Sequence, residues 1–124
     1  MNFTVGRNEP LPLKTILSSN VVTVAVDSQL KSALSMMRAQ SISSVVVVDA
    51  DGRAQGIFTE QDAIRLIAER KSVSELLMAD VMSGPPVKVL PNVGYTVAYQ
   101  LMLEKRVRHL IVVDEGGGLL GLVS

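Results

Sequence analysis

The chain has 124 residues, of which 48% are hydrophobic and only 3% aromatic, so its core must be built from aliphatic side chains. Twelve basic residues balance twelve acidic ones, which argues against nucleic acid as the main partner, since such binding needs many cations to neutralise phosphates. The absence of cysteine excludes disulfides, and a single histidine, His109, leaves too few ligands for an ordinary zinc site.

The opening segment, "MNFTVGRNEP", lacks the apolar stretch of a signal peptide. The longest apolar runs are about strand length, far below the roughly 20 residues that a membrane span needs. We therefore expect a cytoplasmic chain without membrane insertion, either alone or as the cytoplasmic part of something larger.

In chain order, the first half predicts a strand, a helix, two strands and a second helix. One stripe of a helix over 28–40 is formed by Leu30, Ala33, Leu34 and Met37, spaced i, i+3, i+4 and i+7. Asp27 precedes this stripe and is the expected N-cap. The run "SVVVVD" at 44–49 predicts a strand buried on both faces, because it has no alternation of polar residues.

After the turn signal Asp51-Gly52, the stretch "QGIFT" predicts a third strand that leads into a helix over 60–71. The connection that follows contains Ser72 and Glu75, spaced as a capping box that would open a further helix. Pro85-Pro86 would end that helix.

The second half repeats the first at an offset of 65 positions, so that Asp114 matches Asp49 and Gly121 matches Gly56. The matching helix stripe consists of Tyr95, Ala98, Tyr99 and Met102, after Asn92 as the expected N-cap. The copy stops at Ser124, where its last helix should begin, so we expect a fragment or an unseen C-terminus.

Each copy therefore predicts a β-α-β-β-α unit, with a right-handed crossover between its first two strands. The fold class is α/β (α+β), with repeats at 10–71 and 72–124, the second lacking its last helix. One unit is too small to cover its own sheet, so we expect the two to pack about a pseudo-two-fold axis.

The doubled order resembles the cystathionine-β-synthase (CBS) domain pair, also called a Bateman module. Motifs of that family match "ADVMSGPPVKV" at 79–89 and, more weakly, "KTILSSNVVTV" at 14–24. Its middle motif matches "VRHLIVVD" at 107–114 and "ISSVVVVD" at 42–49. Its closing motif, G-h-h-T/S-x-x-D with h apolar, matches "GIFTEQD" at 56–62.

The resemblance implies a regulatory module rather than an enzyme, with no required cofactor. It would bind an adenosyl ligand (AMP, ADP, ATP or S-adenosylmethionine) between the repeats, form a homodimer and control an attached or partner domain. The roles implied for its residues are ribose binding by Asp62, a ribose or phosphate contact by Thr59, base contacts around Val22 and Thr23, and phosphate contacts by Arg108 and His109. Ser43 and Ser44 occupy the matching positions in the first copy without charge, so the two clefts would grip phosphate unequally.

Two alternatives stay open. Thr59 and Asp62 also have the spacing of a capping box that opens a helix, and "EKRVRHL" at 104–110 is also compatible with a solvated helix end. The chain would then be a ligand-free CBS pair used for dimerisation. In either case we expect Ile64, Ile67, Met36 and Leu101 to supply apolar surface for the dimer.

Overall fold

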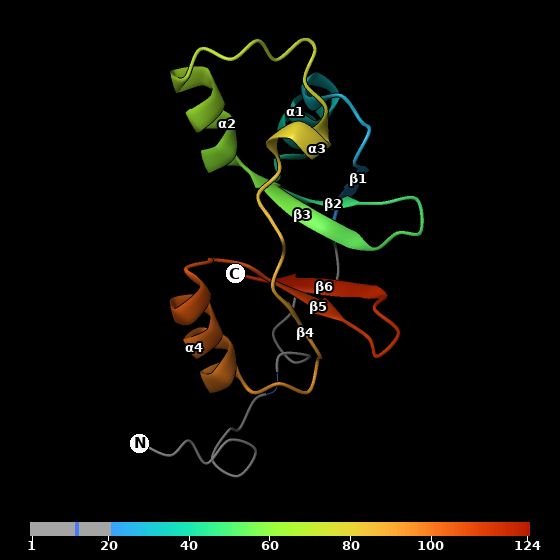
Figure 1. Cartoon of the computed structure of the whole chain (residues 1–124), viewed down its shortest axis with the longest axis vertical. Helices are drawn as coiled ribbons and strands as arrows, with labels where there is room; N and C mark the ends of the chain where they lie inside the picture. The colour runs from blue at the N-terminus through green and yellow to red at the C-terminus, as the bar shows by residue number, and fades with distance from the viewer. Residues whose placement is uncertain (1–11, 13–20) are drawn as a thin grey trace. The chain divides into compact units, whose positions relative to one another are not determined.

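The computed structural model describes Pro12 and residues 21–124, which fall into two compact units (Figure 1). The first unit spans Val21–Pro86, and the second contains Val87–Ser124 with Pro12 paired to Gly94. Residues 1–11 and 13–20, and with them the first part of the predicted opening motif at 14–24, lie outside the described residues. The repeat boundaries at 10–71 and 72–124 and the pseudo-two-fold packing remain predictions.

The first unit has the predicted order of elements. They are β1 (Thr23–Ala25), α1 (Leu30–Gln40), β2 (Ser44–Val48), β3 (Ala54–Thr59), α2 (Glu60–Ala68) and α3 (Met78–Val81). The sheet order is β1-β2-β3, with β1 parallel to β2 and β2 antiparallel to β3. This arrangement follows from the connections, because parallel strands need a crossover such as α1, whereas a short turn suffices between antiparallel strands.

The second unit repeats the strand-helix-strand-strand order of the first and matches its backbone conformation at several positions. Its elements are β4 (Lys88–Val89), α4 (Tyr95–Lys105), β5 (Leu110–Val113) and β6 (Leu119–Val123), with sheet order β4-β5-β6. Helices α1 and α4 both end at a left-handed residue, Ser41 with φ 55° and Arg106 with φ 56°. The predicted turns also match, with Gly52 and Gly117 at positive φ. The predicted fold of two tandem repeats is confirmed.

The predicted N-caps of the two long helices are wrong. Helix α1 has Gln29 as its N-cap and α4 has Gly94, and neither makes a side-chain capping bond. Asp27 and Asn92 each lie two residues too early. At α1 the reason is visible, because the N–H of Leu30 donates to the carbonyl of Leu76 at 2.9 Å. The connecting segment thus satisfies a helix-start donor that a side chain would otherwise serve.

The predicted capping box of Ser72 and Glu75 is also wrong, since residues 72–77 form turns and an isolated bridge. The short helix α3 begins only at Met78. The N–H of Leu77, the N-cap residue of α3, donates to the Asp80 carboxylate at 3.0 Å. This bond fixes the helix start at Leu77 and not at Ser72.

Each sheet packs against helical segments over a small core that is aliphatic apart from Phe58. In the first unit the buried cluster is Leu30, Ala33, Met37, Val45, Val47, Phe58, Leu66, Met78 and Val81. In the second it is Val89, Ala98, Leu110, Val112 and Val123. The stripe predicted on α4 is only partly right, because Tyr95 and Tyr99 are 40% and 64% exposed. Ala98 and Met102 of the predicted stripe do pack in the core, where Leu101 joins them in place of the two tyrosines.

Candidate functional site

The predicted site residues of the first repeat gather at one edge of its sheet. Strands β1 and β2 begin at this edge and the antiparallel β3 ends there. Ser44 pairs with Thr59 in the ladder, and the carbonyl of Ser43 accepts from the N–H of Glu60 at 3.0 Å. The carbonyl of Val22 accepts from Val46 on β2, which brings Val22 and the exposed Thr23 to the same edge.

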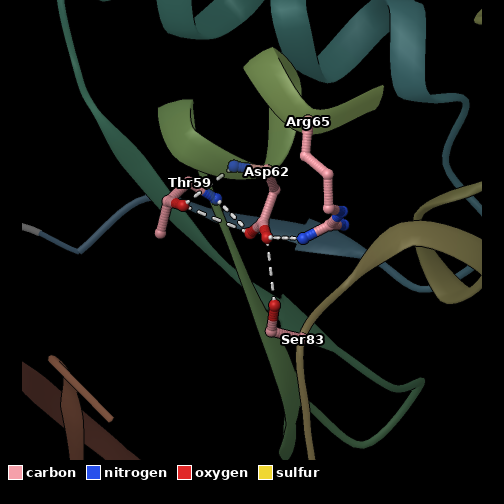
Figure 2. A network of polar contacts seen from close by, with 4 residues as sticks. All are labelled: Thr59, Asp62, Arg65 and Ser83. Carbon is pink, nitrogen blue, oxygen red and sulfur yellow. Dashed lines mark hydrogen bonds and ion pairs between the residues drawn. The ribbon is translucent and has the colours of Figure 1, made fainter. Parts of the chain in front are cut away.

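Asp62 lies in the first turn of α2 and is only 5% exposed (Figure 2). Its Oδ2 accepts from the N–H of Thr59 at 2.9 Å and from the Thr59 hydroxyl at 3.2 Å. The N–H of Asp62 donates back to Thr59 Oγ1 at 3.3 Å. The capping box expected as an alternative is therefore present, and it aims the carboxylate toward the end of β3.

The other carboxylate oxygen of Asp62 binds two side chains from different parts of the chain (Figure 2). Oδ1 accepts from Arg65 Nη1 at 2.8 Å and from Ser83 Oγ at 3.1 Å. The Arg65 side chain is 47% exposed, whereas that of Asp62 is 8% exposed. The ion pair thus compensates a buried charge, a situation in which loss of one partner costs more than in a fully exposed pair.

Ser83 reaches this cluster because its segment lies directly on β3. The N–H of Ile57 donates to the carbonyl of Ser83 at 2.9 Å, and the N–H of Ser83 donates to the carbonyl of Ile57 at 2.8 Å. A Cβ added to Gly56 would lie 2.7 Å from Met82 Sδ and 2.8 Å from the Ser83 carbonyl oxygen. The glycine that opens "GIFTEQD" therefore permits the contact between the connecting segment and the site.

Arg65 and Ser83 are the site residues that sequence reasoning missed. The spacing of Asp62 and Arg65 was a usable signal, because residues three apart lie on one face of a helix. Ser83 lies 21 positions from Asp62, and no local pattern joins the two. Its role emerges only from the packing of the connecting segment against β3.

The remaining predicted residues, Arg108 and His109, lie in the second unit just before β5. Arg108 is exposed and His109 is half-buried. They form a separate candidate group, at the positions that Ser43 and Ser44 hold in the first repeat. Among the described residues, no group of three or more His, Asp or Glu side chains could hold a metal ion. Within the same part of the chain, no helix is long and apolar enough to cross a membrane.

Two β-α-β-β repeats, the first with a capped carboxylate just after its last strand, define a tandem module of the CBS type. The sequence profile of the CBS domain matches residues 13–69 and 78–124. The chain belongs to the CBS domain family.

The curated relatives are longer proteins that contain a region similar to this chain. An uncharacterised protein from Methanopyrus kandleri is 36% identical over 89 residues, which cover 71% of this chain and 45% of the relative. The arabinose 5-phosphate isomerase KdsD of Yersinia pestis is 31% identical over 121 residues, covering 96% of this chain and 37% of the relative. The chain thus spans less than half the length of these relatives.

Solved structures share the whole architecture. A CBS-domain protein from Agrobacterium tumefaciens is 29% identical with a TM-score of 0.78, covering 100% of this chain and 92% of that one. A CBS protein from Pyrobaculum aerophilum in complex with AMP has a TM-score of 0.82 at 21% identity, covering 92% and 87%. A CBS pair in complex with 5′-methylthioadenosine and S-adenosylmethionine has a TM-score of 0.79 at 20% identity, covering 91% and 88%.

Proposed function

We propose that this chain is a regulatory module that binds an adenosyl ligand, AMP, ADP, ATP or S-adenosylmethionine, and controls an attached or partner domain. The observation that carries the proposal is the buried carboxylate of Asp62, held at the sheet edge by Thr59. A carboxylate is the natural acceptor for the two hydroxyls of a ribose. Family members of the same fold hold AMP or S-adenosylmethionine, which supports the choice of ligand class.

In this proposal the ligand lies in the cleft between the repeats. Asp62 accepts from the ribose hydroxyls and Thr59 contacts the ribose or phosphate. The backbone around Val22 and Thr23 meets the base. Ser43 and Ser44 supply uncharged polar contacts on the first repeat, while Arg108 and His109 supply phosphate contacts on the second.

The same proposal includes a homodimer in the cytoplasm. On α2, Ile64 and Ile67 are 66% and 67% exposed, far above what a core residue shows. Met36 and Leu101 are half-buried. Exposed apolar surface of this kind favours an interface. Light scattering at high micromolar concentration should give the mass of a dimer, and a monomer under these conditions would contradict this part.

A ligand-free scaffold is the second candidate, and one observation favours it. The Asp62 carboxylate accepts four hydrogen bonds from Thr59, Arg65 and Ser83, so the cluster is also complete as a structural cap. A scaffold would use the CBS pair for dimerisation alone.

The experiment that separates the two candidates is a thermal-shift screen with adenine and guanine nucleotides and S-adenosylmethionine, followed by calorimetric titration of the hits. A ligand that binds only the native state raises the melting temperature by mass action. Saturable binding of an adenosyl ligand, with no response to the guanine nucleotides, is the expected result. No response to any adenosyl ligand at millimolar concentration would leave the scaffold as the function.

A further inference from the structure

The carboxylate of Asp62 has no free acceptor capacity. A carboxylate offers about four lone-pair sites. In this structure Thr59 supplies two donors to Oδ2, while Arg65 and Ser83 each supply one to Oδ1. Because the residue is also 5% exposed, a ribose cannot add its hydroxyls to this arrangement. At least one of the present donors has to leave when a ligand binds.

Arg65 is the donor that can move with the least disturbance of the backbone. The donors from Thr59 belong to the cap of α2, and their loss would free the helix start. Ser83 is held in place by two backbone hydrogen bonds to Ile57. The Arg65 side chain, in contrast, is long and 47% exposed, and the bond to Asp62 holds it at the site.

We propose that Arg65 makes the Asp62 site selective for an adenosyl ligand that carries phosphate, such as AMP, over S-adenosylmethionine. This inference rests on the proposed function. The ribose hydroxyls replace the guanidinium on Oδ1, and the guanidinium turns to the phosphate attached to the same ribose.

Charge compensation is the reason for the selectivity. A neutral diol that displaces Arg65 leaves the buried carboxylate without a cation, which is costly. A phosphate keeps the guanidinium at the site, because a planar fork of N–H donors suits phosphate oxygens. S-adenosylmethionine has a positively charged sulfonium where AMP has its phosphate, and its carboxylate is several bonds further from the ribose, so it gains less from Arg65 than AMP does.

The test is calorimetric titration of AMP, adenosine and S-adenosylmethionine into the whole chain and four variants. Arg65→Gln removes the charge and keeps a donor for Asp62, whereas Arg65→Lys keeps the charge. Arg38→Gln is the matched control, because Arg38 is an exposed cation in the last turn of α1. Ser83→Ala removes the other donor to Oδ1 without a change in charge.

With Arg65→Gln, AMP should bind about tenfold more weakly, because one charge-assisted hydrogen bond is lost. Adenosine and S-adenosylmethionine should bind as tightly as before or more tightly. Arg65→Lys should keep the preference for AMP, Arg38→Gln should change nothing, and Ser83→Ala should alter all three affinities by one common factor.

Equal changes for AMP and adenosine with Arg65→Gln would overturn the inference, as would a loss of AMP selectivity with Ser83→Ala. Unchanged AMP binding by Arg65→Gln would overturn it while the proposed function stands. If the wild-type chain binds none of the three ligands, the proposed function fails and this inference fails with it.

Discussion

The two repeats share their backbone but differ in their side-chain chemistry. Positions that need a left-handed backbone match at the offset of 65, as Ser41 and Arg106 do. Buried side chains do not match, since Leu30 is buried in the first repeat, whereas Tyr95 at the matching position is 40% exposed. The backbone conformation is therefore kept at turn positions, where few residue types are tolerated. The side chains differ at surface positions, where many residue types are tolerated.

The largest difference expected between the repeats is in core stability. Phe58 is fully buried in the first repeat, and its counterpart Val123 is 8% exposed in the second. Phe58→Ala should lower the free energy of unfolding by about 3–5 kcal/mol. Val123→Ala should lower it by about 1.6 kcal/mol, since two buried methylene equivalents are lost. Urea denaturation measures both, and equal losses would show that the two cores contribute alike.

The second expected effect concerns the Asp62 site of the first repeat. Asp62→Ala should weaken an adenosyl ligand about 10- to 100-fold, as loss of a charge-assisted hydrogen bond requires. It should also lower the free energy of unfolding by about 2 kcal/mol, because the Thr59 N–H and the Ser83 hydroxyl lose their acceptor. Calorimetric titration and urea denaturation of one preparation separate the two effects. Unchanged affinity in a folded variant would remove Asp62 from the site.

The sequence predicts the fold of this chain more completely than its candidate site. The apolar periodicity and the 65-residue offset predicted every strand and long helix, because those signals arise from core burial along the chain itself. The start of α1 was missed because its first N–H bonds to Leu76, a tertiary contact with no local signal. At the site, Thr59 and Asp62 could be predicted from their spacing. Ser83 could not, since its place depends on how the connecting segment packs on Gly56.

A smaller effect is expected from the cap that sets α2 apart from α1 and α4. Thr59→Ala removes the acceptor of the Asp62 N–H and one donor to Oδ2, at about 1 kcal/mol. The matched control is Thr23→Ala, since Thr23 is exposed and should change stability by less than about 0.5 kcal/mol. Thermal unfolding of both variants checks the difference. Similar losses in the two would mean that the cap adds little to α2.

The smallest effect should come from supplying α1 with the cap that it lacks. Gln29 is exposed, has extended backbone geometry and makes no side-chain capping bond, and the first turn of α1 contains no acidic residue. Gln29→Asp places a carboxylate where it can accept from N–H groups of the first turn and complement the helix dipole. The free energy of unfolding should rise by about 0.5 kcal/mol at low salt, and less at high salt because the charge term is screened. Gln29→Ala is the control that removes the side chain without adding a cap. A gain of equal size in both variants would show that Gln29 itself is unfavourable at this position, and that the absent cap is not what limits the stability of α1.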